Sequence, residues 1–351
     1  MKIFIDIGHP AHVHYFKNFY RIMSQQGHEF LIIARDKEIS QQLLDSYEIP
    51  YLSRGKGRKS TFGKLVYLLK ANMLLLKNAL SFKPDLFLSF SSPYAAQVSS
   101  ILRKPHIAFD DTEHARLGRM MYRPFTDLVL SPESYKGKLS QKQTLFKGYM
   151  ELCYLHPNYF KPDPTVLQML GVEEGERYIV LRFVSWNATH DSGHSGISLE
   201  NKRVTVKEFS KYGRVFISSE EQLPKELQPY RISIPPDKMH DVLNYATLFF
   251  GESATMASES AVLGTPAIYL DNEGRGYTDD LERSYGLVHN FTESPQDQEK
   301  AIQKGIDLLQ NRNIKLESMA NRKRLLEEKI DVTDFLIKKV EEVIKQSASA
   351  S

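Results

Sequence analysis

Apolar residues recur along the chain in two alternating patterns. Short β-branched and aromatic runs predict strands, and apolar positions three and four residues apart predict helices in the segments between them. The predicted strands are residues 3–7, 30–34, 85–90, 106–109, 127–130, 178–183, 214–218, 248–251 and 266–270. The predicted helices are residues 13–26, 38–47, 62–82, 94–102, 235–246, 255–263, 299–310 and 315–343. Strands that alternate with helices in this way predict parallel sheets with helices on both faces.

The alternation stops between residues 150 and 165, where Pro157, Pro162 and Pro164 interrupt any regular element. It resumes with the strand at 178–183. The sequence therefore predicts two doubly wound α/β domains, residues 1–155 and 165–330. A charged C-terminal helix at 331–346 and a short polar tail at 347–351 follow. A length of 351 residues fits two domains of ordinary size.

Composition and charge exclude several classes of protein. Lys and Arg number 46 against 43 Asp and Glu, so the net charge of +3 does not indicate a nucleic-acid binder. Cys153 is the only cysteine, which excludes an intramolecular disulfide and a cysteine-built zinc site. Asp6 and His9 interrupt the first apolar run too early for a secretory signal. We expect a cytoplasmic protein, with the inner membrane face as its one alternative location.

A basic run at residues 54–59 precedes the apolar segment 62–82. One interpretation is peripheral contact with anionic lipid or with a polyprenyl-phosphate acceptor. The other is a solvated loop followed by a core-facing helix of a globular domain, and we favour it. Lys70, Asn72, Lys77 and Asn78 break the longest apolar stretch, so no membrane span is expected.

The first predicted strand leads into a loop that contains three histidines. Asp6 ends the strand, and His9, His12 and His14 follow around the start of the next helix. A small-residue turn before a helix suits an anion or a sugar, because backbone N–H groups there have no partner inside the helix. We predict that His12 is a general base oriented by Asp6, with His9 and His14 on the acceptor side. The alternative has His14 on the helix surface and His9 supporting the turn.

A second candidate site follows the strand at 248–251. Ser253 and Thr255 lie where hydroxyls and helix amides hold a phosphate at the positive end of a helix dipole. Glu259 lies further along this helix, where a carboxylate can accept both hydroxyls of a ribose. The alternative is a capping box, with Ser253 as an ordinary cap and Glu259 as an exposed helix residue.

Other loops after strands add further candidates. Arg182 ends the strand at 178–183, and His190 lies in the polar loop after it; both suit a diphosphate. Arg182 has a structural ion pair within the sheet as its alternative. Glu252 and Arg275 complete the donor-side set, Arg275 as a phosphate partner in a glycine-containing loop.

On the acceptor side, Asp111 and Glu113 follow the strand at 106–109. They either bind acceptor hydroxyls, supply a base, or cap the helix that follows. None of these residues forms a pattern typical of a metal site, so we expect neither metal nor cofactor.

The segment from Ser253 to Glu259, followed by Leu263-Gly264-Thr265-Pro266, resembles the nucleotide-binding stretch of MurG-type glycosyltransferases. It is also similar to that of non-hydrolysing UDP-N-acetylglucosamine 2-epimerases. In both groups a Ser meets the diphosphate and a Glu six residues on holds the ribose, a spacing kept by Ser253 and Glu259. Ala11-His12-Val13 resembles the Gly-His-Val of the MurG-type first loop. The glycine pairs of both groups are replaced here at 7–10 and 254–255.

Over residues 1–345 the chain resembles the DUF354 family. The residues that carry this resemblance lie in Asp6 to Val13, Asp111 to His114, Gly148 to Leu152 and Thr255 to Glu259. The resemblance implies a GT-B-like fold with two Rossmann-like domains facing a central cleft, and a C-terminal helix crossing back to the first domain.

The function that this resemblance implies is a metal-independent glycosyltransferase. It would move a sugar from a nucleotide-diphosphate donor, a UDP-sugar, to a glycan or lipid-linked glycan acceptor, in surface polysaccharide synthesis. A nucleotide-sugar 2-epimerase and a non-catalytic nucleotide-sugar binding protein are the alternatives.

Overall fold

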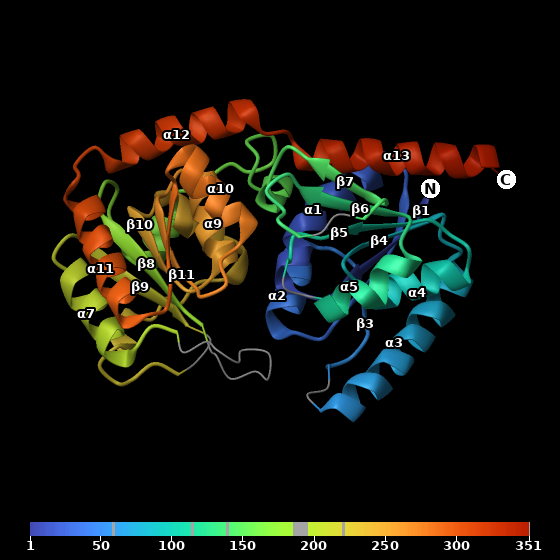
Figure 1. Cartoon of the computed structure of the whole chain (residues 1–351), viewed down its shortest axis with the longest axis horizontal. Coiled ribbons are helices and arrows are strands. Elements are labelled where there is room, and N and C mark those ends of the chain that lie inside the picture. Colours follow the sequence, from blue (N-terminus) through green and yellow to red (C-terminus); the bar gives the residue numbers. More distant parts are fainter. Residues whose placement is uncertain (58–59, 114–115, 138–139, 185–195, 220–221, 351) are drawn as a thin grey trace. The chain divides into compact units, whose positions relative to one another are not determined.

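The computed structural model describes residues 1–57, 60–113, 116–137, 140–184, 196–219 and 222–350 (Figure 1). The chain divides into two compact units. Unit 1 consists of Met1–Tyr159 together with Lys329–Ser351, and unit 2 consists of Phe160–Glu328. The division between Tyr159 and Phe160 lies where the strand–helix alternation of the sequence stops. The return to unit 1 at Lys329 explains why the charged C-terminal segment follows no strand.

Unit 1 is built on a parallel seven-stranded sheet with the order β3-β2-β1-β4-β5-β6-β7. Its strands are β1 (Lys2–Ile7), β2 (Glu29–Ala34), β3 (Leu52–Ser53), β4 (Leu86–Phe90), β5 (His106–Phe109), β6 (Leu128–Pro132) and β7 (Gln143–Phe146). Its helices are α1 (Pro10–Gln25), α2 (Glu38–Ser46), α3 (Thr61–Phe82), α4 (Pro93–Ile101), α5 (Arg116–Tyr122) and α13 (Val332–Ala350), with 3-10 turns η1 (Arg123–Phe125) and η2 (Met150–Cys153).

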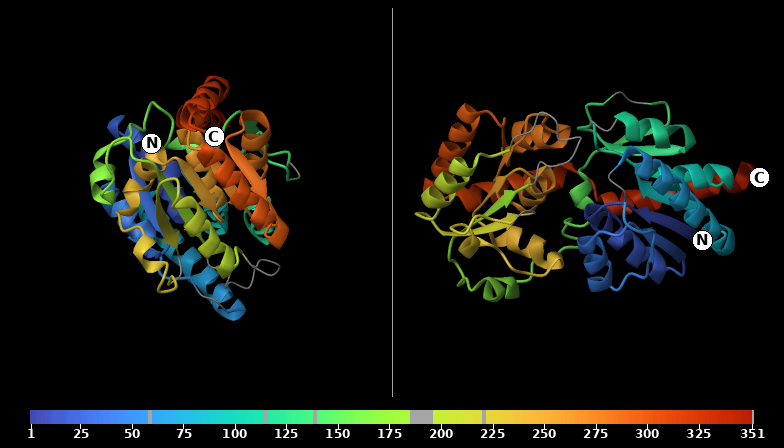
Figure 2. Two further views of the ribbon diagram at one scale, coloured as in Figure 1. Left: turned by 90° about the vertical axis from the view of Figure 1, so that its left-hand side faces the viewer. Right: turned by 90° about the horizontal axis from the view of Figure 1, so that it is seen from below.

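Helices cover both faces of this sheet (Figure 2). On one face the aromatic rings of α1, the sheet and α13 form a chain, in which Phe146 lies 6.0 Å from Phe109 and 5.5 Å from Phe335 between ring centroids. On the other face Leu75 of α3 and Ala95 of α4 pack on strand residues of the sheet. Burial of these apolar runs on both faces is the pattern expected of a parallel sheet.

Unit 2 is built on a parallel five-stranded sheet with the order β12-β11-β10-β8-β9. Its strands are β8 (Tyr178–Phe183), β9 (Arg214–Ser219), β10 (Leu248–Gly251), β11 (Ala267–Leu270) and β12 (Val288–Phe291). Its helices are α6 (Thr165–Leu170), α7 (Leu199–Phe209), α8 (Met239–Tyr245), α9 (Ala254–Leu263), α10 (Gly276–Tyr285), α11 (Pro295–Gln310) and α12 (Ile314–Glu328), with 3-10 turns η3 (Gln228–Tyr230) and η4 (Pro236–Lys238). Helices α7 and α11 enclose the main apolar core of this unit against the sheet.

The prediction of two parallel α/β domains is confirmed. The sequence missed β3, β7 and β12 because these edge strands are short and carry exposed or half-buried side chains rather than an apolar run. The single helix predicted at 315–343 is wrong: it is two helices, α12 and α13, separated at the return to unit 1.

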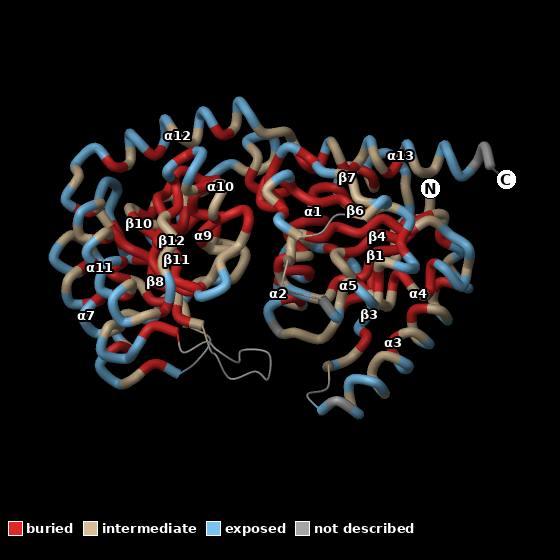
Figure 3. Tube along the Cα trace, in the orientation of Figure 1, coloured by how far each residue is buried: buried red, intermediate tan, exposed pale blue. Residues whose placement is uncertain are grey.

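The prediction that the segment 62–82 faces the core is also wrong in large part. Five of its large apolar side chains are more than half exposed to solvent. Figure 3 colours much of α3 as exposed or intermediate. Among the described residues, the segment Phe62–Phe82 of α3 is the one helix long and apolar enough to cross a membrane, and 17% of its most apolar window is buried.

Candidate functional site

Each sheet has a point where the direction of strand order reverses. In unit 1 this point lies between β1 and β4, because the chain builds outward from β1 through β2 on one side and from β4 through β5 on the other. In unit 2 it lies between β8 and β10. Open α/β sheets bind ligands at the carboxyl ends of the strands on either side of such a point. A candidate residue that binds a ligand is therefore expected to lie at one of these two sheet edges.

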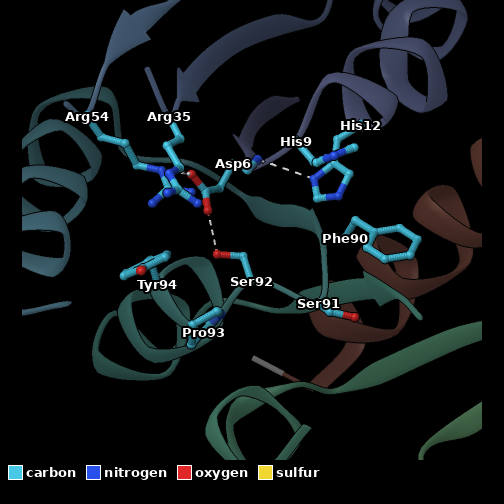
Figure 4. A pocket seen from close by; sticks show the side chains of 11 residues that line it. Asp6, His9, His12, Arg35, Arg54, Phe90, Ser91, Ser92, Pro93 and Tyr94 are labelled. Atoms are coloured by element: carbon cyan, nitrogen blue, oxygen red, sulfur yellow. Dashed lines mark hydrogen bonds and ion pairs between the residues drawn. The ribbon is translucent and has the colours of Figure 1, made fainter. Parts of the chain in front are cut away.

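A cavity of about 190 Å³ opens at the switch point of unit 1 (Figure 4). Its walls come from the carboxyl ends of β1, β2, β3 and β4, which the fold brings to one edge. The cavity is lined by Asp6, Gly8, His9, His12, Arg35, Arg54, Phe90, Ser91, Ser92, Pro93 and Tyr94. The predicted site residues Asp6, His9 and His12 thus lie together.

Asp6 is held by two partners that the sequence did not predict. Its Oδ1 lies 2.9 Å from Nε of Arg54, and its Oδ2 accepts a hydrogen bond from the hydroxyl of Ser92. The Asp6 and Arg54 side chains are 0% and 3% exposed. Burial raises the pKa of Asp6, while Arg54 and Ser92 act in the opposite direction. The predicted orientation of His12 by Asp6 is wrong, because the carboxylate is engaged by Arg54 and Ser92 instead.

His12 is oriented by the backbone. The N–H of Gly8 donates to its Nδ1 over 3.2 Å. Burial lowers the pKa of His12 well below the usual range of a histidine, and the positive charges of Arg54 and Lys37 act in the same direction. The ring is therefore neutral near pH 7. Since a backbone N–H can only donate, the proton of the neutral ring lies on Nε2, and in this state His12 offers a hydrogen-bond donor through Nε2.

The other two histidines of the first loop have separate roles. His9 is the N-cap of α1, and its Nδ1 accepts from the N–H of Ala11 over 3.3 Å. His14 is buried away from the cavity, where its ring stacks on Tyr154 at 5.2 Å and its Nδ1 lies 3.3 Å from the Tyr47 hydroxyl. The helix-surface alternative for His14 is wrong, because its side chain is buried against Tyr47 and Tyr154, and His14 does not line the cavity.

Asp111 and Glu113 follow β5 at the same edge of the sheet but do not line the cavity. Asp111 Oδ1 accepts from the Thr112 hydroxyl over 3.1 Å, and Glu113 Oε1 accepts from the backbone N–H of Lys136. The buried carboxylate of this loop is Asp110, which accepts from the Tyr122 hydroxyl. Asp111 and Glu113 remain half-buried acceptor-side candidates next to a structural Asp110.

At the switch point of unit 2, α9 begins directly after β10. Ser253 is its N-cap, and its Oγ accepts from the N–H of Met256 over 3.3 Å. Ser253 and Thr255 are half-buried at the helix start. Gly251 sits against β8, where a Cβ would meet the carbonyl oxygen of Arg182 at 2.3 Å. Glycine is therefore required for β10 to approach β8 and bring the α9 N-terminus to this edge.

Glu259 lies in the interior of α9 and is buried rather than exposed. Its Oε1 lies 2.9 Å from Nε2 of His240 on α8, and the two side chains are 7% and 4% exposed. The capping-box interpretation of Glu259 as an exposed helix residue is therefore wrong. A carboxylate fixed in this way keeps one orientation, as a hydrogen-bond acceptor for a specific ligand has to.

Glu252 holds the backbone at both ends of the segment 185–195. Its carboxylate accepts from the N–H groups of Val184, over 2.8 Å, and Ile197. Glu293 adds a third bond, from the N–H of Gly196 over 2.8 Å. The Glu252 side chain is buried and holds the backbone on both sides of this segment, whereas the donor contact predicted for it stays a prediction. His190 lies within the segment, outside the described residues.

The two candidate arginines of unit 2 each contact polar side chains of unit 2. Arg182 at the end of β8 donates from Nη1 to the hydroxyl of Ser218 over 3.0 Å. Arg275 is the N-cap of α10, with Nη1 3.7 Å from Glu273 Oε2 and Nη2 4.0 Å from Asp271 Oδ2. Arg182 lies near the end of β8, whereas Arg275 lies at the start of α10 and is partly neutralised by Asp271 and Glu273. Within the described parts of the chain, His, Cys, Asp and Glu form no cluster able to hold a metal ion.

One family of proteins matches nearly the whole chain. The profile of the family described as "Protein of unknown function (DUF354)" matches residues 1–345. The chain belongs to this family. An uncharacterized protein of Methanocaldococcus jannaschii is 25% identical over 279 residues, which are 76% of this chain and 81% of the relative.

Solved structures similar to this DUF354 chain include a UDP-GlcNAc 2-epimerase and a MurG. The UDP-GlcNAc 2-epimerase of Neisseria meningitidis, bound to UDP-GlcNAc, matches with a TM-score of 0.73 at 13% identity over 97% of this chain and 100% of that chain. MurG of Acinetobacter baumannii matches with a TM-score of 0.61 at 13% identity over 97% and 99%. These likenesses confirm the predicted GT-B-like fold of the DUF354 chain, and at such identities they show the fold alone.

Sequence reasoning missed three residues that shape the two sites of the DUF354 chain. Arg54 and Ser92 lie 48 and 86 positions from Asp6 and reach it only through strand order. His240 is expected from its amphipathic helix to be a surface or packing residue, but it contacts Glu259 between α8 and α9. The one available signal was position: Arg54 and Ser92 each closely follow a strand, as functional loop residues in α/β sheets do.

Proposed function

We propose that this chain is a glycosyltransferase of the GT-B fold that uses a nucleoside-diphosphate sugar, with UDP as the nucleotide. The observation that carries the proposal is the switch point of unit 2. There the N-terminus of α9, with the Ser253 hydroxyl, is followed by a buried Glu259 whose orientation His240 fixes. The spacing of Ser253 and Glu259 is the one on which the resemblance to nucleotide-sugar enzymes rests.

The α9 N-terminus suits the diphosphate. The first N–H groups of a helix lack intrahelical partners, and the helix dipole adds positive potential at that end. The Ser253 oxygen already accepts from the Met256 N–H, so the hydroxyl hydrogen is directed to another acceptor, such as a phosphate oxygen. The hydroxyl of Thr255 is placed for a second such bond. In this proposal Glu259 receives the ribose hydroxyls, and Arg182, Arg275 and His190 assist the diphosphate.

The reaction follows from this placement. The acceptor hydroxyl oxygen forms a bond to the anomeric carbon while the bond from that carbon to the diphosphate oxygen breaks. The diphosphate leaves with the electron pair, and the helix amides of α9 stabilise its charge. The acceptor binds at the cavity of unit 1, where Arg35 favours an acceptor that carries negative charge, while Arg54 is already paired with Asp6. The acceptor proton passes to an oxygen of the departing diphosphate as the new bond forms.

The structure changes the proposal for His12. A general base needs an unprotonated nitrogen facing the acceptor, but the Gly8 N–H occupies Nδ1 and leaves the proton on Nε2. We therefore propose that Nε2–H of His12 positions the acceptor by donating to it. His12→Gln supplies an N–H donor at a similar reach and cannot act as a base, whereas His12→Ala supplies neither. Retention of most of the transfer rate by His12→Gln and its loss in His12→Ala would support the donor role; equal loss in both would restore the base.

The donor site is tested by titration calorimetry with UDP, GDP, CDP and ADP. We expect one of them, UDP, to bind, and Glu259→Gln to weaken it by about 10- to 150-fold, the cost of hydrogen bonds to a charged group. Glu299→Gln is the matched control, since Glu299 is exposed on α11 and should leave affinity unchanged. Absence of binding by all four nucleotides would overturn the proposal.

A second experiment separates transfer from isomerisation. The protein is incubated with UDP-N-acetylglucosamine without any acceptor, and the sugar signals are followed by NMR. A transferase leaves the sugar configuration unchanged, whereas inversion at its second carbon would replace the proposal by a 2-epimerase. Nucleotide-sugar binding that persists with no reaction across a panel of acceptors would point to a binding protein.

A further inference from the structure

Helix α3 carries a continuous apolar stripe on its outer side. Its inner side packs on the sheet through Ala71, Leu75 and Ala79, which are 2%, 0% and 1% exposed. The outer side exposes Phe62 (77%), Leu65 (55%), Leu69 (58%), Met73 (63%) and Leu80 (58%). At 3.6 residues per turn these five fall within about 80° of arc. In Figure 1 the helix extends away from the sheet of unit 1. Single exposed apolar residues are common, but a stripe of this length indicates an interaction surface.

The charges around the stripe have one sign. Lys70 and Lys77 are exposed along one side of it, and neither has an ion-pair partner among the described residues. From Ile49 to Pro84 the sequence contains eight Lys and Arg and no Asp or Glu. Helices α4 and α5, which continue the layer beside α3, also lack acidic residues, although the chain as a whole carries 43. Three helices of this layer thus carry no acidic residue.

A groove lies beside the stripe. It has a volume of about 740 Å³ and is lined by basic Lys56 and Lys70 together with apolar Phe62 and Val66. Arg54 lines both this groove and the switch-point cavity of unit 1, and the Tyr67 hydroxyl accepts from it over 3.1 Å. Basic and apolar groups side by side match the phosphate and acyl regions of an anionic lipid.

From these observations we propose that the outer side of α3 docks on an anionic lipid bilayer, with the apolar stripe in the interface and the lysines against lipid phosphates. The helix lies on the membrane rather than across it, because its inner side is part of the core of unit 1. The charge pattern favours lipid over a second copy of the chain. An isologous dimer would bring Lys70 and Lys77 of both copies together with no acidic residue on the face to pair with them. The proposal is independent of the reaction proposed above.

The full chain is tested by co-sedimentation with phosphatidylcholine vesicles that contain either no anionic lipid or about 30% phosphatidylglycerol. We expect binding to the anionic vesicles alone, weakened in about 0.5 M NaCl because salt screens the lysines. Lys70→Gln/Lys77→Gln should weaken binding by about 25-fold, at about fivefold per lysine. Leu69→Glu should weaken it at least about tenfold.

Leu316→Glu is the matched control, because Leu316 is 74% exposed on α12 of unit 2 and the same change there should leave vesicle binding intact. Circular dichroism checks that each variant is folded. A fluorophore on Met73→Cys gives a second readout: its emission should shift to the blue with anionic vesicles, whereas one on Leu316→Cys should not. Equal binding to both vesicle types, no binding to either, or a dimer in light scattering that Leu69→Glu dissolves would each overturn the proposal.

Discussion

The ion pair between Asp6 and Arg54 gives the sharpest test of how unit 1 is held together at its switch point. We consider Asp6→Asn, Arg54→Met and the two combined. The asparagine keeps the volume of the side chain and an oxygen that accepts from Ser92, so the change removes little besides the charge. Glu29→Gln is the matched control. Its ion pair with Lys2 joins β1 to β2 over 3.4 Å, but the Glu29 and Lys2 side chains are 64% and 41% exposed.

The expected loss of stability in Asp6→Asn follows from the Asp6–Arg54 distance and the burial of both side chains. At 2.9 Å and an effective dielectric constant of about 20, the attraction between the two charges is about 6 kcal/mol. Most of this offsets the desolvation of two buried ions, so the pair adds little net stability. Removing the charge of Asp6 alone leaves a guanidinium 3% exposed without its counter-charge, and breaking a buried pair in this way costs about 3–5 kcal/mol. The exposed control pair contributes about 0–1 kcal/mol.

The assay is urea unfolding followed by hydrogen exchange of peptides from each unit, because the two units need not unfold together. With a slope of about 2 kcal/mol per molar urea, Asp6→Asn should lower the midpoint of unit 1 by about 1.5–2.5 M. Peptides from β10 in unit 2 should keep their midpoint. The double variant should lose less stability than Asp6→Asn alone, since it leaves no unpaired charge. An effect of Asp6→Asn no larger than that of Glu29→Gln, or single losses that add in the double variant, would refute the reasoning.

Three further predictions concern stability and the loop after β8. Burial lowers the pKa of His106 to about 3. As the pH falls below about 6.5, the unfolded state therefore gains a proton that the folded state does not. The stability of unit 1 should decrease by about 1.4 kcal/mol for each pH unit that the pH is lowered from about 6.5 to about 3. His106→Asn should flatten this dependence in urea midpoints measured from pH 7 to 5, and an unchanged slope would contradict it. Gly264→Ala should lower the free energy of unfolding by about 2–3 kcal/mol, because Gly264 has φ +82° and an added Cβ would lie 2.6 Å from Met319 Sδ. The control Gly286→Ala, at φ +63° and with open space around it, should lower it by only about 1 kcal/mol. Equal shifts of the urea midpoint for the two variants would count against the contact with Met319. Glu252→Gln should speed hydrogen exchange on both sides of the segment 185–195 without changing β11 peptides, and unchanged exchange there would show that Glu252 does not hold the loop.

In the candidate site, local sequence patterns predict helix starts but not contacts between residues that are distant in sequence. Helix start signals placed Ser253 correctly at the N-terminus of α9, since a cap depends on residues within one turn. The partner of Asp6 was assigned to its neighbour His12, but a carboxylate at a strand end meets side chains from adjacent strands, and these come from positions far away in sequence. The contact of His240 with Glu259 could not be predicted for the same reason, because it joins side chains of two different helices.

The sequence by itself determined the two parallel α/β domains, because buried strands such as β5 and β8 need continuous apolar runs and their helices need apolar positions at helical spacing. Tertiary structure decided which polar groups meet and which apolar groups stay uncovered. Strand order brought Arg54 and Ser92 to Asp6. Helix α3 reads as a core helix by composition, yet its outer stripe is exposed because no other described element packs over it. Hydropathy indicates whether a side chain favours burial, but only the tertiary structure determines whether other residues pack over it.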